Sequence, residues 1–199
     1  MPLIVDYADV LQRMSGEGFR CNYHHSGAFG FGPGAQVLIR GWIGPDDATI
    51  RPGLLPSIRR ISPPFAPHLA EALLRAWQTS LRGVAWLMPM SHWHFELHDG
   101  SRDWLPDRLE EIGVDPAALR DRADGSALQF ALDESPALST VIIALLENLK
   151  VSDFQLAFPG RPALCMIHHH TQLWWQTTDA KLIRHIDAAL PAAFTGTAQ

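Results

Sequence analysis

Segments typical of helices and segments typical of strands follow one another along this chain in an irregular order. Apolar residues spaced three or four apart indicate helices, and short β-rich runs between turn residues indicate strands. We expect helices at 3–14, 67–81, 104–112, 137–150 and 180–190, and strands at 19–25, 35–42, 84–90, 92–98, 127–132, 154–158, 163–169 and 173–177. Because no steady strand–helix alternation is present, we predict an α+β two-layer sandwich: an antiparallel or mixed sheet with helices mainly on one face. An α/β fold is the alternative.

The 199-residue chain is long enough to bury one well-packed core. We expect a single globular domain over residues 1–190, followed by a frayed tail at 191–199. An N-terminal hairpin is expected at 19–42, where a glycine-rich loop separates two strand-like runs. The proline-rich segment 44–67 can neither continue a helix nor form a central strand, so it should cross the surface. Both segments should pack on the rest of the domain.

The charge and the cysteine content limit the classes of partner and compartment. The formal net charge is −5 and the basic residues are scattered, which disfavours nucleic acid and anionic membranes as partners. The longest apolar runs, 84–90 and 141–146, are too short to span a bilayer. The first residues lack the basic region of a secretory signal, and Cys21 and Cys165 suit free thiols in a reducing compartment. These features favour a cytoplasmic, bacterial-type protein.

Polar and apolar side chains alternate without exception in residues 91–98, Ser-His-Trp-His-Phe-Glu-Leu-His. As a strand, this segment would place His92, His94, Glu96 and His98 on one face. Residues two apart on a strand are separated by about 6.6 Å, whereas zinc binds its ligands at about 2 Å. At most two neighbours in this row could therefore share one metal ion, and the other ligands must come from elsewhere.

The segment from Cys165 to His170 is the obvious source of further ligands. Strand alternation puts His168 and His170 on one face and His169 on the other. If this strand lies beside 92–98, the opposed histidines could bind Zn²⁺ or a similar divalent metal, and a carboxylate could serve as general base or fifth ligand. The candidate metal ligands are His92, His94, Glu96, His168 and His170, with Glu96 as the candidate base. The alternative is that the row is the solvated face of an ordinary strand.

Cys21 with the nearby His24 and His25 resembles a nucleophile beside a base. No third orienting residue or oxyanion-hole motif accompanies this pair. A hairpin strand that buries Cys21 and Tyr23 explains the same pattern more simply.

Trp174 and Trp175 are adjacent, so on a strand one of them faces the core and the other faces away. A partly exposed tryptophan between Gln172 and Gln176 could anchor a partner. Our leading hypothesis is a non-catalytic binding or accessory protein whose His/Trp-bearing sheet face meets a partner protein or a small ligand. The alternative is a metal-dependent, Zn-type hydrolase or oxidoreductase with a His/Glu site.

Overall fold

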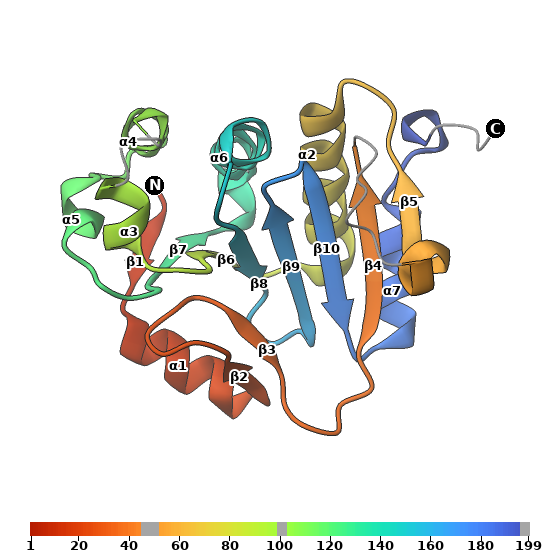
Figure 1. Ribbon diagram of the computed structural model, residues 1–199, viewed down its shortest axis with the longest axis horizontal. Coiled ribbons are helices and arrows are strands. Elements are labelled where there is room, and N and C mark those ends of the chain that lie inside the picture. Colours follow the sequence, from red (N-terminus) through yellow and green to blue (C-terminus); the bar gives the residue numbers. More distant parts are fainter. Residues whose placement is uncertain (45–51, 99–102, 196–199) are drawn as a thin grey trace.

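The structure of the protein, a computed structural model, describes residues 1–44, 52–98 and 103–195 (Figure 1). The helices are α1 (Tyr7–Gly16), α2 (Phe65–Ala76), α3 (Trp93–His98), α4 (Trp104–Glu111), α5 (Ala117–Arg120), α6 (Ser135–Asn148) and α7 (Ala180–Ala188). The strands are β1 (Leu3–Val5), β2 (Phe19–Cys21), β3 (Phe29–Phe31), β4 (Leu38–Ile43), β5 (Ile58–Arg60), β6 (Ala85–Pro89), β7 (Ala127–Phe130), β8 (Phe154–Ala157), β9 (Ala163–His168) and β10 (Gln172–Thr177).

One eight-stranded open sheet organises the molecule, in the order β1-β7-β6-β8-β9-β10-β4-β5. Every neighbouring pair is antiparallel except β4 and β5, which are parallel. β2 and β3 form a separate two-stranded hairpin. The α+β prediction with a mixed sheet is therefore confirmed.

Two apolar cores lie on opposite faces of the sheet. In β6, Ala85 and Leu87 belong to the larger core with α2, α6 and α7, whereas Trp86 and Met88 belong to the smaller core. The smaller core is closed by α1 and the β2–β3 hairpin, so the helices lie mainly on one face, as expected (Figure 1). The hairpin is fixed to the sheet by Gln155 of β8, whose side chain exchanges hydrogen bonds of 2.7 and 3.0 Å with the backbone of Phe29. Among the described residues, no helix is long and apolar enough to cross a membrane.

The N-terminal third of the chain differs from the expected hairpin at 19–42. The first strand-like run does form β2, but its partner is β3, which arises within the glycine-rich segment. The second run forms β4 and joins the main sheet between β10 and β5. The expected helix at 3–14 likewise begins only at Tyr7, because residues 3–5 pair with β7 as an edge strand.

The proline-rich crossing segment and the tail are partly structured. Residues 58–60 form the edge strand β5, while residues 45–51 of the segment lie outside the described residues. The tail is docked at its start, since Phe194 stacks on His68 at 3.9 Å and Thr195 forms a bridge with Ile61. Fraying therefore does not begin at residue 191, and residues 196–199 lie outside the described part.

Candidate metal centre

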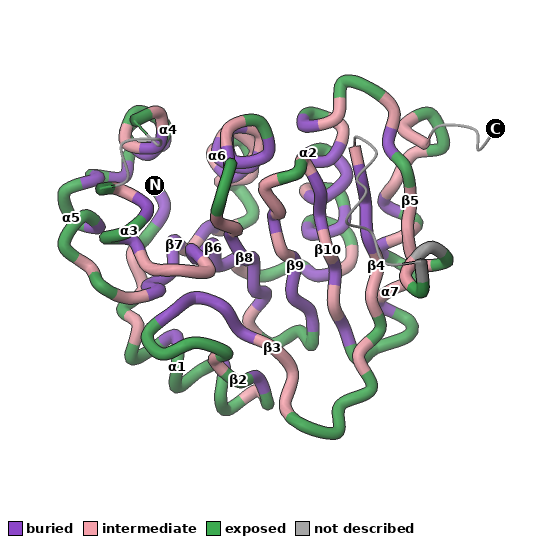
Figure 2. The backbone as a smooth tube through the Cα atoms, in the orientation of Figure 1, coloured by how far each residue is buried: buried purple, intermediate pink, exposed green. Residues whose placement is uncertain are grey.

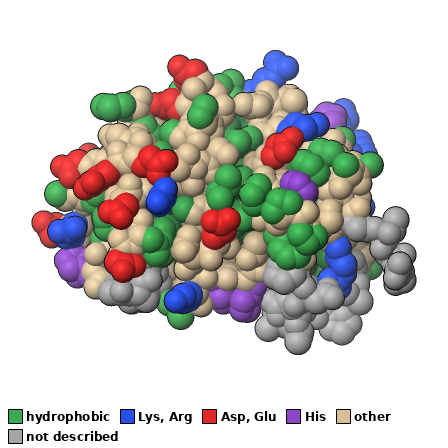
Figure 3. Space-filling view, turned by 90° about the horizontal axis from the view of Figure 1, so that it is seen from above, with side chains coloured by type: hydrophobic (Ala, Val, Ile, Leu, Met, Phe, Trp, Pro, Cys, Tyr) green, Lys and Arg blue, Asp and Glu red, His purple; other side chains and the backbone are tan. Residues whose placement is uncertain are grey.

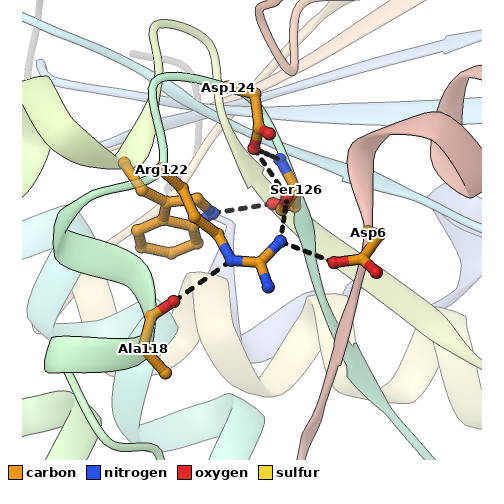
Figure 4. Close-up of polar contacts among 6 residues, drawn as sticks. Asp6, Ala118, Arg122, Asp124 and Ser126 are labelled. Atoms are coloured by element: carbon orange, nitrogen blue, oxygen red, sulfur yellow. Dashed lines mark hydrogen bonds and ion pairs between the residues drawn. The ribbon is translucent and has the colours of Figure 1, made fainter.

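Residues 93–98 form the helix α3, so the prediction of a strand at 92–98 is wrong. The burial follows a helical period: Trp93 and Glu96 are buried and Leu97 is partly buried, whereas His94, Phe95 and His98 are exposed. Trp93 fixes the helix, because its indole N–H donates to the Ser126 carbonyl at 2.7 Å. Ser126 belongs to a polar cluster around Arg122 and Asp124 that orders the segment leading into β7 (Figure 4).

The predicted row of three histidines and a carboxylate is therefore dispersed. His94 and His98 lie one helical turn apart on the solvent side, with ring centroids 4.1 Å apart. His92 precedes the helix, and its Nδ1 is buried without a hydrogen-bond partner in the described part of the chain. Glu96 points to the opposite side from His94. The four side chains cannot form the ligand row that the alternation indicated.

Glu96 is fully buried and accepts hydrogen bonds from two serine hydroxyls. Ser91 donates to Oε1 in a short contact, and Ser152 donates to Oε2 at 2.9 Å. The buried carboxylate accepts from both hydroxyls and thereby joins α3 to the start of β8. Its geometry is that of a structural group and does not support the role of general base.

The second histidine segment ends strand β9 and forms the turn into β10. His168 pairs with Gln172, which leaves His169, His170 and Thr171 as a three-residue hairpin loop. Thr171 has φ = 58°, the left-handed conformation that commonly closes such loops. Its hydroxyl donates to the Leu146 carbonyl at the end of α6 at 3.0 Å, which holds the turn against the helix.

Because the strand stops at His168, the alternation that would separate His169 from its neighbours also stops. One ring nitrogen from each of His168, His169 and His170 lies within 4.8 Å of the other two. The ring centroids of His168 and His169 are 4.2 Å apart, and those of His169 and His170 are 4.3 Å apart. We call this group the histidine turn. Figure 3 looks down onto the end of the sheet where this turn lies and shows histidine side chains at the rim.

Asp153, just before β8, orients the central ring of the three and lies near a second. Its Oδ1 accepts hydrogen bonds from the backbone N–H of His169 at 3.0 Å and from Nδ1 of the same residue at 2.8 Å. Its Oδ2 lies 4.0 Å from Nε2 of His168, whose Nδ1 accepts from the backbone N–H of His170. A carboxylate on Nδ1 fixes the tautomer and leaves Nε2 of His169 as the nitrogen that could coordinate, which is the usual second-shell arrangement of metal-binding histidines.

The donor set is suited to a borderline divalent ion. Three imidazoles match Zn²⁺ and related transition metals, and ligands at about 2 Å from zinc lie about 3.3 Å from one another. The measured separations within 4.8 Å require small side-chain rotations. Among the described residues, the histidine turn is the one group of three or more potential ligands this close together, and neither His92, His94 nor Glu96 belongs to it.

The sequence interpretation found His168 and His170 but missed His169 and Asp153. A strand that continued through residue 169 would place His169 on the opposite face, but β9 ends at His168. His169 joins the group because the pairing of β9 with β10 ends at His168 and Gln172, and this register cannot be read from the sequence composition. Asp153 adjoins β8 in the sequence and reaches the turn only through the antiparallel pairing of β8 with β9.

The two adjacent tryptophans take the two positions expected of them. Trp175 is fully buried in the larger core, with its ring 5.4 Å from that of Trp42. Trp174 faces the other side of the sheet and is partly exposed. Trp174 is therefore the one of the pair that can contact a ligand.

Cys21 adjoins a cavity of about 310 Å³ lined by Tyr7, Leu11, Cys21, Tyr23, His24 and His25. Its thiol donates to the Tyr23 carbonyl at 2.7 Å and lies 3.3 Å from the Tyr7 hydroxyl. Burial, together with the neighbouring thiol, raises the pKa of Tyr7 above its ordinary value. Among the described contacts of this sulfur, none is a hydrogen bond to a histidine, so the geometry does not support a nucleophile–base pair.

Comparison of the chain with protein-family models, with curated proteins and with solved structures finds no match. The functional argument therefore depends on the residues of this chain alone.

Proposed function

We propose that this protein is a non-catalytic binding protein that holds one divalent transition-metal ion, Zn²⁺ or a similar ion, at the histidine turn. The observation that carries the proposal is the convergence of His168, His169 and His170 within ligand distance, with Asp153 holding Nδ1 of the central ring. A carboxylate in this position raises the basicity of the ring that it orients. An exposed surface histidine needs no such partner.

The same geometry favours binding over metal-dependent hydrolysis or oxidation. A hydrolase needs a base near the metal-bound water, and the sequence offered Glu96 for that role. Glu96 is fully buried and engaged by Ser91 and Ser152, and Asp153 is engaged by the histidines themselves. We therefore assign these carboxylates to structure and to ligand orientation.

Both cysteines are free, which fits a reducing compartment. Burial raises the pKa of Cys165 well above its ordinary value, so that this thiol stays protonated and makes a poor metal ligand. We accordingly propose that the protein acts in the cytoplasm and binds its metal through imidazoles only.

Isothermal titration with ZnCl₂, on protein freed of any affinity tag, tests the proposal. We expect one ion per chain, and a loss of affinity of at least about 100-fold in His169→Ala. His94→Ala is the matched control, because it removes an imidazole from the other histidine segment and should leave the affinity unchanged. No zinc binding, or an equal loss in both variants, would refute the proposal.

A further inference from the structure

The cavity beside Cys21 lies between α1 and the loop that joins β2 to β3, and we call it the aromatic cavity. Its volume of about 310 Å³ is at the lower end of the range for small-molecule sites. In Figure 1, α1 and the β2–β3 hairpin lie at the lower end of the view, whereas the histidine turn between β9 and β10 lies at the upper end. The aromatic cavity is therefore separate from the candidate metal centre.

The loop that forms one wall of the aromatic cavity is firmly held. Residues 22–25 of this loop are exposed and residues 26–28 are buried (Figure 2). The carbonyl of His25 accepts from the N–H of Gly125 at 2.8 Å, and the N–H of Gly27 donates to the Pro89 carbonyl at 3.0 Å. A Cβ at Gly27 would collide with that carbonyl oxygen, so only glycine permits this approach. His25 is fixed at φ = 58°, a strained conformation that persists where the surroundings impose it.

Aromatic rings form most of the wall. The rings of Tyr7 and His25 meet edge to face at 5.8 Å, and those of His25 and His24 lie 3.8 Å apart. Tyr23 adds a fourth ring and is 68% exposed, so the protein leaves much of it uncovered. The face of a phenol ring attracts a cation that lies within about 6 Å of its centre. Several such rings around a small space suit a ligand whose positive charge is spread over an apolar surface.

The polar groups of Tyr7 and Cys21 are already engaged. The thiol donates to the Tyr23 carbonyl at 2.7 Å and lies 3.3 Å from the Tyr7 hydroxyl. Burial and this thiol raise the pKa of Tyr7, and the charge of Asp124 raises it further, so negative potential reaches the phenol. A quaternary ammonium group matches these conditions, because it carries a positive charge but has no N–H that requires an acceptor.

The charged residues around the aromatic cavity also favour a cation. None of the described lining residues is a lysine or an arginine. Asp6 and Asp9 lie at the start of α1, where they offset the positive end of the helix dipole. The guanidinium of Arg122 is bound to Asp6 at 2.6 Å (Figure 4). Arg20 lies on the opposite face of β2 from Cys21, near Gly32.

We propose that the aromatic cavity binds a small quaternary ammonium alcohol of the choline type, with its trimethylammonium group against the rings of Tyr7, Tyr23 and the two loop histidines. A carboxylate in place of the alcohol would be repelled by Asp6, Asp9 and Asp124, so glycine betaine should bind more weakly than choline. The proposal goes beyond the metal site and does not depend on the ion.

An NMR titration with choline chloride in EDTA tests this proposal, at about pH 8, above the range in which histidine ordinarily takes up a proton. The matched neutral probe is neohexanol, in which a carbon atom replaces the charged nitrogen of choline. We expect choline to bind at least about fivefold more tightly than neohexanol, since only choline gains the cation–π attraction. Absence of choline binding, or equal affinity for the two probes, would overturn the proposal.

Variants of the exposed ring locate the effect. Tyr23→Leu keeps an apolar side chain but removes the ring, so it should weaken choline at least about fivefold and reduce the preference over neohexanol. Tyr23→Phe keeps the ring and should bind choline like the unaltered protein. Phe95→Leu removes an exposed ring that does not line the cavity and is the matched control. An undiminished affinity in Tyr23→Leu, or an equal loss in Phe95→Leu, would contradict the assignment; circular dichroism of each variant checks the fold.

The thiol in the wall provides an independent reporter of occupancy. Cys21 is partly exposed and Cys165 is fully buried, so iodoacetamide should alkylate only Cys21 in the folded protein. Saturating choline should slow this alkylation, and neohexanol at the same concentration should slow it less. An alkylation rate that choline leaves unchanged would place the ligand elsewhere. A tripeptide with a central trimethyllysine that bound tenfold more tightly than choline would overturn the assignment to a free small molecule.

Discussion

Two segments of this chain are rich in histidine, and they have opposite fates in the fold. Residues 91–98 carry three histidines and a glutamate in strict alternation. Residues 93–98 nevertheless form the helix α3, which separates these side chains. Residues 168–170 are three consecutive histidines, which on a strand would point to alternate faces, yet the turn brings all three together. The difference shows that histidine spacing indicates a metal site only when the local backbone conformation is known.

The two segments also use their carboxylates differently. In the first, Glu96 points inward and joins α3 to Ser152 at the start of β8. In the second, Asp153 stays partly exposed and orients the imidazole of His169 in the histidine turn. The two carboxylates thus lie close to each other in the fold, one supporting structure and the other supporting the candidate ligands.

Removing the buried carboxylate should produce the largest change in stability. Glu96→Ala leaves the hydroxyl groups of Ser91 and Ser152 without their acceptor and creates a cavity, so we expect a loss of about 3 kcal/mol in the free energy of unfolding. Urea denaturation followed by circular dichroism measures this. Glu96→Gln keeps one acceptor oxygen and should lose less. If the zinc affinity of the folded variant fell as strongly as in His169→Ala, the division between the two segments would be wrong.

Replacing the orienting carboxylate should affect binding rather than folding. Asp153→Asn removes the charge beside His169 and should weaken zinc binding about 10- to 100-fold, with little change in the urea midpoint. Asp121→Asn, at an exposed position, is the matched control and should bind zinc like the unaltered protein. Unchanged affinity in Asp153→Asn would show that this carboxylate does not orient the ligands.

The anchoring of the histidine turn to α6 predicts a smaller effect. Thr171→Val keeps the branched side chain and the backbone strain at φ = 58° but removes the hydroxyl that donates to Leu146. We expect a loss of about 1 kcal/mol in stability and a measurable weakening of zinc binding. Thr171→Ser, which retains the hydroxyl, should restore both. A Val variant that matches the unaltered protein in both measurements would argue against the anchor.

The smallest effect should come from the exposed histidines of the first segment. His98→Ala removes a ring on the solvent side of α3, so its stability should stay within about 0.5 kcal/mol of the unaltered protein. Zinc affinity should not change. A clear loss of zinc binding would mean that the α3 histidines hold the ion.

Much of the fold could be predicted from the sequence because its longer segments have unambiguous periods. The apolar spacing in 137–150 and 180–190 corresponds to α6 and α7, and the β-rich runs at 154–158 and 163–169 correspond to β8 and β9. The strand prediction for residues 92–98 was wrong because an alternation over so few residues is also compatible with a short helix. A reader of the sequence assigns Glu96 to solvent, since an ionisable side chain is rarely buried without partners. Its serine partners, one of them 56 positions away, become visible only in the fold.

The candidate metal site could be predicted only in part, because it also depends on tertiary contacts. His168 and His170 stand out as a pair in the sequence, and the partial exposure of Trp174 follows from its adjacency to a buried tryptophan. The inclusion of His169 depends on where β9 ends, which is set by its pairing with β10. The approach of Asp153 depends on the pairing of β8 with β9, a tertiary feature with no local signature.

Anomalous X-ray scattering at the zinc edge, from crystals of tag-free protein grown with ZnCl₂, tests the metal site most directly. We predict one strong peak about 2 Å from ring nitrogens of His168, His169 and His170. The absence of a peak at this turn, or a peak between His94 and His98 alone, would contradict the proposed metal-binding role.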